Sequence, residues 1–176
     1  MENTKEKKEL GNWGEMALDD WMKINDWNPI NKNLRIKKGE IDRIYFHKDR
    51  ETQETKFCIT EIKTSLFYKV KDIEILFTET GVKRYLKQRQ IQNLYRYGEN
   101  LIALLYQQKT RNFKVYLRFF IVFKSLHSLS RMNLEKLPRS PAIKKCYTGE
   151  NYLIFSIEPE FTGINSRKSL LQVKVY

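Results

Sequence analysis

The sequence predicts an α/β domain with a mixed central β-sheet flanked by helices, followed by a small β-containing C-terminal extension. Two patterns predict this class: apolar residues recur at steps of three and four in two long segments, and at steps of two in several shorter ones. The chain has 176 residues, of which 41% are hydrophobic, enough for one domain with a substantial core. We place a boundary near residue 125, between a core of residues 1–124 and an extension of residues 125–176.

The first helix is predicted over residues 5–23. Its apolar residues recur at helical spacing: Leu10, Trp13, Ala17 and Trp21. The helix is expected to end before the turn-rich segment of residues 25–33, because Pro29 disfavours a helical residue ahead of it.

Strands are predicted next, a short one at residues 34–36 and then two longer ones at residues 40–46 and 56–64. The polar segment between the two longer strands marks the tip of a hairpin. If its turn is centred between Glu51 and Thr52, residues whose numbers sum to 103 stand opposite each other, and Asp42 faces Glu61. The same register forms two apolar pairs, Ile44 with Ile59 and Phe46 with Phe57.

The second half of the chain predicts another helix over residues 81–101, with an apolar face and a basic one. Residues 101–108 and 114–124 are then predicted as strands, the second covered on both faces because its apolar run is continuous. A last hairpin is predicted over residues 142–160, around the turn sequence "TGEN".

Composition restricts the partners and the compartment. The formal net charge is +12, from 33 Lys and Arg against 21 Asp and Glu, which favours a polyanion such as nucleic acid. No segment approaches eighteen apolar residues and the N-terminus lacks a signal-peptide core, so we expect no membrane association and a cytoplasmic or otherwise intracellular location. Cys58 and Cys146 are isolated, predict neither a zinc site nor a disulfide framework, and are interpreted as small buried hydrophobes.

In this register, Asp42 and Glu61 lie on one face of the sheet with their Cβ atoms about 4.5 to 5.5 Å apart. Two carboxylates this close do not both stay charged without a cation. A hard cation such as Mg²⁺ would be held by this pair and the carbonyl of Ile62. Lys63 could then position a water or stabilise charge on a phosphorus centre. The alternative is an ordinary cross-strand salt bridge among Asp42, Glu61 and Lys63.

Three motifs occur in order over about residues 10–65: "GNWGEMALDDWM", "NKNLRIKKGEIDRIYF" and "KFCITEIKT". Together they resemble the YraN-type, Holliday-junction-resolvase-like branch of the PD-(D/E)xK superfamily, whose fold is restriction-endonuclease-like. The resemblance implies a role for each matching residue: Glu15 as the helix-borne metal ligand, Asp42 as the central ligand, Glu61 as the second ligand and Lys63 as the catalytic lysine. It also implies that Gly14 and Ala17 let the first helix lie close to the sheet.

The resemblance further implies a metal-dependent endonuclease that cuts DNA with Mg²⁺ or Mn²⁺, with branched or junction DNA as the favoured substrate and a homodimer to match a symmetric junction. The sequence departs from the superfamily pattern at Ile41, where a Pro is usual, as it does in this branch. The basic helix also lacks a clean Q-x-x-x-Y motif. The alternatives are an inactive nuclease-fold module that binds nucleic acid or docks on a larger complex, and an RNA-directed endonuclease.

Basic and Gln residues around the second strand and the second helix are the expected contacts to nucleic acid. These are Arg35, Lys37, Lys38, Lys83, Arg84, Lys87, Gln88, Arg89 and Gln92. Gln88 and Gln92 stand one turn apart and are candidates to reach the active site. Tyr95 and Tyr97 are candidates for stacking on bases.

Overall fold

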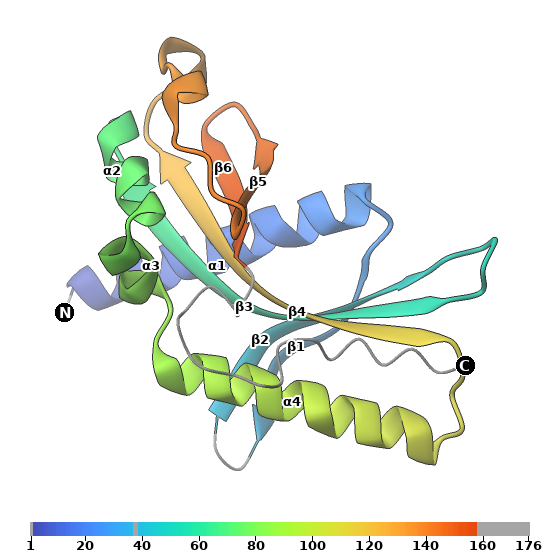
Figure 1. Cartoon of the computed structure of the whole chain (residues 1–176). Helices are drawn as coiled ribbons and strands as arrows, with labels where there is room; N and C mark the ends of the chain where they lie inside the picture. The colour runs from blue at the N-terminus through green and yellow to red at the C-terminus, as the bar shows by residue number, and fades with distance from the viewer. Residues whose placement is uncertain (1, 37–38, 158–176) are drawn as a thin grey trace.

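The computed structural model describes residues 2–36 and 39–157, with side chains described at 4–30, 41–78 and 80–157. Its centre is a mixed sheet of six strands in the order β1-β2-β3-β4-β6-β5, in which β3 and β4 are parallel and the other neighbours antiparallel (Figure 1). The predicted α/β class with a mixed sheet is confirmed. The strands are β1 Asn28–Ile36, β2 Gly39–Lys48, β3 Thr55–Phe67, β4 Phe113–Ser125, β5 Ile143–Thr148 and β6 Tyr152–Ile157.

Helices cover both faces of the sheet (Figure 1). Helix α1 (Glu2–Ile24) packs on one face, while α2 (Val70–Glu74), α3 (Glu79–Tyr85) and α4 (Gln88–Gln107) pack on the other. Single 3₁₀ turns lie at Ile75–Phe77, Leu129–Arg131 and Leu134–Lys136. Across the described residues, no helix is long and apolar enough to cross a membrane.

Strand β4 contributes to a hydrophobic core on each face of the sheet. Phe119, Ile121 and Phe123 belong to the core beneath α4, whereas Phe120 and Val122 belong to the core beneath α1. Successive strand residues point to opposite faces, so a strand covered on both sides needs a continuous apolar run. The predicted two-sided burial of this strand is confirmed.

The β2–β3 hairpin has the predicted register. Ile44 stands opposite Ile59 and Phe46 opposite Phe57. At the tip, Asp49 Oδ1 accepts hydrogen bonds from the backbone N–H groups of Glu51 and Thr52, each at 3.0 Å. This side-chain turn fixes the connection that sets the register.

Two predicted elements were wrong. Residues 101–108 continue α4 as far as Gln107 and form no strand. Ile102 and Leu105 are buried at helical spacing from Leu94, and a short apolar run of Leu and Ala suits a helix as well as a strand. The single helix predicted over residues 81–101 is also broken, since Leu86 and Lys87 adopt extended backbone between α3 and α4.

The first strand is longer than predicted, because β1 begins at Asn28 and runs through Pro29. β1 is an edge strand, where the missing N–H of a proline removes no hydrogen bond from the sheet. Its pairing with β2 shifts between Pro29 and Asn31, as expected at a bulge. The last predicted hairpin is confirmed as β5 and β6, and β6 joins the sheet beside β4.

Helix α1 lies close to β3 at Gly14. A β-carbon at this position would lie 2.8 Å from Cβ of Thr64 and would overlap its hydroxyl group. Ala17, one turn further along, is buried. The close approach expected at these two residues is therefore present.

We expect Gly14→Ala to destabilise the protein by about 1–3 kcal/mol, because the added methyl group overpacks the contact with Thr64. The matched control is Gly11→Ala in the same helix, where an added Cβ meets no atom within 4 Å and should stabilise by up to about 1 kcal/mol. Urea unfolding of both variants measures the difference. Equal effects would contradict the close approach.

Candidate functional site

Asp42 lies where β2 and β3 separate. The pairing of these strands runs from Lys48 opposite Thr55 to Arg43 opposite Thr60. Beyond that pair, the backbone N–H of Ile62 donates to Oδ2 of Asp42 at 2.7 Å. The Asp42 carboxylate is thus held against the middle of the "EIK" segment of β3.

Glu61 is the most buried candidate carboxylate, with 7% of its surface exposed. Its Oε1 accepts a hydrogen bond from Lys63 Nζ at 2.6 Å and a second, short one from Gln90 Nε2 on α4. Burial raises the pKa of Glu61 above its ordinary value, the charge of Asp42 raises it further, and Lys63 and Gln90 oppose the shift. The structure therefore brings Asp42, Glu61 and Lys63 together, although the β2–β3 register stops at Arg43 and Thr60, one pair short of the predicted opposition of Asp42 and Glu61.

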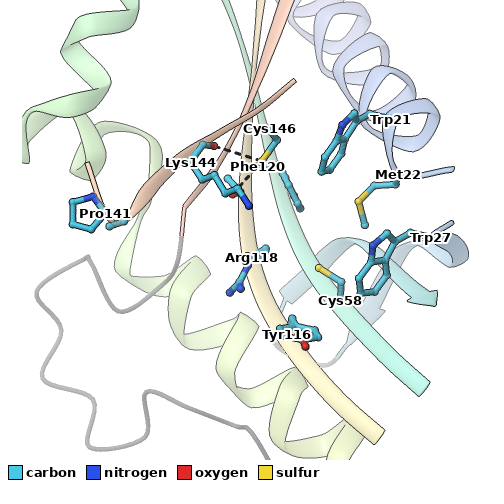
Figure 2. Close-up of a pocket in the computed structure, with 12 residues that line it drawn as sticks. Trp21, Met22, Trp27, Cys58, Tyr116, Arg118, Phe120, Pro141, Lys144 and Cys146 are labelled. Carbon is cyan, nitrogen blue, oxygen red and sulfur yellow. Dashed lines mark hydrogen bonds between the residues drawn. The ribbon is translucent and has the colours of Figure 1, made fainter. Parts of the chain in front are cut away.

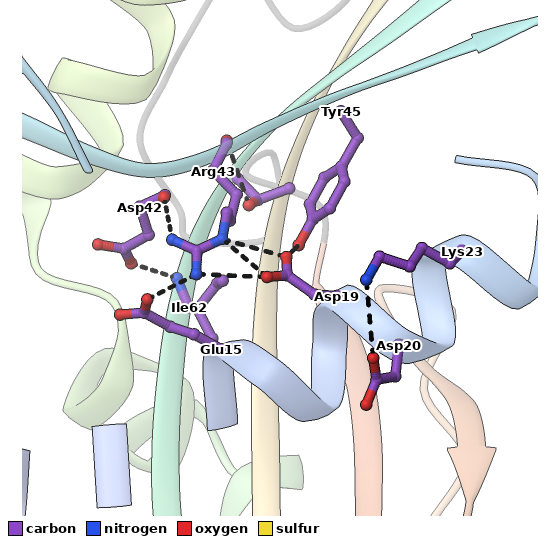
Figure 3. A network of polar contacts seen from close by, with 9 residues as sticks. Glu15, Asp19, Asp20, Lys23, Asp42, Arg43, Tyr45 and Ile62 are labelled. Atoms are coloured by element: carbon purple, nitrogen blue, oxygen red, sulfur yellow. Dashed lines mark hydrogen bonds and ion pairs between the residues drawn. The ribbon is translucent and has the colours of Figure 1, made fainter. Parts of the chain in front are cut away.

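Glu15 is positioned by a buried arginine that the sequence analysis did not single out. Arg43 Nη2 lies 2.8 Å from Oε2 of Glu15, and Arg43 Nη1 donates to the Asp42 carbonyl at 2.8 Å (Figure 3). On its other side, Arg43 Nε donates to Oδ1 of Asp19 at 3.1 Å. The same Asp19 oxygen accepts from the Tyr45 hydroxyl at 2.6 Å, so one network joins α1 to β2.

The pKa of Glu15 is also raised. Burial is the largest cause, the Arg43 charge opposes it, and the Asp42 charge adds to it. Four carboxylates gather around two cations in this region: Glu15, Asp19, Asp42 and Glu61 against Arg43 and Lys63. When all are ionised, the cluster carries a surplus of two negative charges.

The expected three-carboxylate ligand set is not assembled. Among the described side chains, at residues 4–30, 41–78 and 80–157, no group of three or more His, Cys, Asp or Glu is close enough to hold a metal ion. The Glu15 carboxylate binds Arg43 instead. The arrangement offers Asp42 and Glu61 as the carboxylate pair, with Glu15 beside them.

The basic residues predicted to contact nucleic acid surround the junction of α3 and α4. Four of them are exposed there: Lys83, Arg84, Lys87 and Arg89. Gln88 and Gln92 are exposed as well, whereas Gln90 between them points to Glu61. The side chain of Arg35, and Lys37 and Lys38 entirely, lie outside the described residues.

Gln90 and Arg43 are the residues that sequence reasoning missed at the site. Gln90 stands four residues before the buried Leu94, so it is a polar residue on the apolar face of α4. Its Oε1 is buried and has no hydrogen-bond partner within the described chain. Arg43 lies in β2, which is an interior strand between β1 and β3. A cation buried in an interior strand requires a counter-charge nearby.

The stacking interpretation of Tyr97 is wrong, because its side chain is 5% exposed and belongs to the core beneath α4. Tyr95 is half-buried and packs against the same core. Tyr97 faces the core because it lies at helical spacing from Leu94 and Leu101. The local sequence Tyr95-Arg96-Tyr97 suggested exposed rings and did not show this spacing.

The mixed sheet with helices on both faces is consistent with a restriction-endonuclease-like fold. The chain is similar to a "UPF0102 protein" of Treponema denticola, with 25% identity over 139 residues that cover 78% of this chain and 97% of that relative. No family model matches the sequence. No solved structure matches it either.

Glu61 predicts a specific dependence of stability on pH in metal-free buffer. The ordinary pKa of a Glu carboxyl group is 4.5, and folding raises that of Glu61. Such a group stabilises the folded state when the pH is below 4.5, and this contribution is lost as the pH rises through the raised pKa. Glu61→Gln should therefore raise the free energy of unfolding at neutral pH and leave it nearly unchanged near pH 4.5. Urea titrations between these pH values measure the difference.

The control is Glu51→Gln, at the exposed tip of the hairpin, which should change stability little at any pH. A loss of stability in Glu61→Gln at neutral pH would show that the ion pair with Lys63 outweighs burial and repulsion. The ordinary salt-bridge interpretation would then be the better one.

Proposed function

We propose that this protein is a divalent-metal-dependent endonuclease that hydrolyses DNA phosphodiester bonds, with branched or junction DNA as its favoured substrate. The observation that carries the proposal is the meeting of Asp42, Glu61 and Lys63 where β2 and β3 separate. The distant similarity to a UPF0102 protein supports it, since the YraN-type branch falls in UPF0102.

The donor set suits Mg²⁺ or Mn²⁺. Asp42 and Glu61 supply hard carboxylate oxygens, the Ile62 carbonyl is the expected third ligand, and the surplus of two negative charges would be neutralised by one divalent cation. Glu15 would join only after leaving Arg43, which binds it at 2.8 Å. A bound cation would lower the pKa of an attacking water and polarise the phosphate.

Lys63 would assist the reaction. Its side chain is 30% exposed while its ammonium group contacts Glu61, so it lies between the carboxylates and solvent. In hydrolysis, the water oxygen forms a bond to phosphorus and gives a proton to solvent, while the bond from phosphorus to the leaving oxygen breaks and that oxygen takes a proton from solvent. Lys63 would hold the water or stabilise the charge that grows on the phosphate oxygens.

The exposed basic residues at the start of α4 would bind the DNA backbone beside the site. Arg89 adjoins Gln90, which contacts Glu61, so phosphates bound along this surface pass close to the carboxylates. The net charge of +12 supports a polyanionic substrate. A symmetric junction would require two such sites and hence a homodimer.

A second candidate is a nuclease-fold module that binds nucleic acid, DNA or RNA, without cutting it. The observation in its favour is that Glu15 and Lys63 each have an internal partner, Arg43 and Glu61 respectively. In a module without cleavage, these ion pairs would be structural.

The metal site predicts that Mn²⁺ stabilises the protein against heat. At a hundredfold excess over the dissociation constant, the gain is about 2.7 kcal/mol, and Asp42→Asn should remove it. Asp20→Asn is the matched control on the exposed face of α1, and should keep the full response. Thermal unfolding with and without Mn²⁺ measures both; an equal response in the two variants would contradict a site at Asp42.

Lys63→Ala should reduce cleavage by about two orders of magnitude or more, because it removes one electrostatic donor beside the reacting phosphate. Binding should weaken only slightly, since affinity is shared among many cations. The assay follows binding and cleavage separately on four-way junction, flap, duplex and single-stranded DNA and on RNA, with Lys71→Ala on α2 as the exposed control.

Joint neutralisation of Lys83, Arg84, Lys87 and Arg89 should have the converse effect. Binding to all substrates should weaken and its salt dependence fall, while cleavage of bound DNA continues. Tight binding by the wild type without cleavage of any substrate in either metal would favour the non-cutting module.

A further inference from the structure

A cavity of about 300 Å³ opens on the face of the sheet that α1 covers (Figure 2). Trp21 and Trp27 lie on one side of it and Lys144 on the other, with Arg118 between them on β4. Cys58 on β3 also lines the cavity. Its side chain belongs to the core on the α1 face, whereas that of the next residue, Ile59, belongs to the core beneath α4. The C-terminal hairpin thus completes a cavity with α1 and the centre of the sheet.

This cavity is separate from the candidate catalytic site. Cys58 and Phe120 belong to the core on the α1 face, whereas Glu61 contacts Gln90 of α4 on the opposite face. The sheet lies between the cavity and Glu61, and none of the residues that line the cavity belongs to the candidate site. A ligand in the cavity would not meet the Asp42 and Glu61 carboxylates.

The lining combines aromatic walls with positive charge. Trp21, Trp27, Tyr116 and Phe120 contribute rings, and Arg118 and Lys144 contribute cations. Among the described residues that line the cavity, none is acidic. An apolar pocket with a few convergent polar groups of one sign is the usual form of a small-ligand site, and this one selects an anion with a flat apolar part.

Arg118 is held in place for such a role. Its guanidinium lies over the Tyr116 ring, 5.6 Å from the ring centroid, and its Nη1 donates to the Leu117 carbonyl at 3.0 Å. A guanidinium fixed in this way loses little freedom when it binds a phosphate or carboxylate bidentately. Lys144, exposed on β5, can approach the same anion from the other side.

We propose that this cavity binds one nucleotide unit, a planar base joined through its sugar to a phosphate monoester. The base would stack against Trp21 or Trp27, and Arg118 and Lys144 would bind the phosphate. A volume of about 300 Å³, at the lower end of ligand pockets, suits one such unit and excludes a duplex. The unit is either a free mononucleotide or the unpaired terminal nucleotide of a strand.

The test is calorimetry of the full chain in EDTA, so that no metal-dependent cleavage contributes. The ligands are adenosine and cytidine monophosphates, their nucleosides, inorganic phosphate, and a short 5′-phosphorylated single strand. Wild type should bind a monophosphate or the strand with a dissociation constant below about 1 mM, and bind nucleoside or phosphate alone more weakly. Binding of the free monophosphate identifies the first source, and binding of the strand alone identifies the second.

Arg118→Gln and Lys144→Gln should each raise the dissociation constant at least about tenfold, as expected for loss of a charge-assisted hydrogen bond. Lys145→Gln is the matched control, with the same charge loss on the next residue of β5, whose side chain is outside this cavity. It should bind within about twofold of wild type. Circular dichroism confirms that each variant is folded.

A second measurement uses the wild type alone. Cys146 lines the cavity and is half-buried, whereas Cys58 is 4% exposed. The bound nucleotide should therefore slow alkylation of Cys146. The proposal is overturned if no nucleotide or strand binds up to about 10 mM, or if Arg118→Gln and Lys145→Gln bind alike and Cys146 is not protected.

Discussion

The Arg43 guanidinium lies between α1 and β2, where only 3% of its side chain reaches solvent. A cation buried to this extent needs counter-charges, which come from Glu15 and Asp19 on the helix, and the Asp42 carbonyl on its own strand accepts a further hydrogen bond. Removing the guanidinium would take from the buried Asp19 carboxylate its ion pair with Arg43 and leave its hydrogen bond from Tyr45 in place. The helix is thereby held to the strand at the point where the candidate ligands meet.

The candidate site also depends on the separation of β2 from β3. Because the pairing ends at Arg43 and Thr60, the Ile62 N–H is available to the Asp42 carboxylate, which brings two acids together beside one lysine. Lys63 and Gln90 share a single oxygen of Glu61. These two hydrogen bonds hold the buried Glu61 side chain between β3 and α4.

The sheet divides the molecule into two chemical environments. On the α4 face lie Glu61 and the exposed basic surface of the α3–α4 junction, and on the α1 face lies the aromatic cavity with its two cations. The β5–β6 hairpin extends the sheet and contributes Lys144 to that cavity. The C-terminal segment thus adds two strands to the sheet and one wall to the cavity.

The sequence by itself determined the α/β class, the β2–β3 register and the meeting of Asp42, Glu61 and Lys63, because strand periodicity and the turn at Asp49 are local properties. Only the tertiary structure decided that Gln90, and neither Gln88 nor Gln92, contacts Glu61, since that depends on how α4 is rotated on the sheet. The same holds for Arg43 and Asp19, 24 residues apart, whose contact requires α1 to cross β2. Residues 101–108 remained ambiguous in sequence because packing on the sheet, rather than local propensity, extends α4 through them.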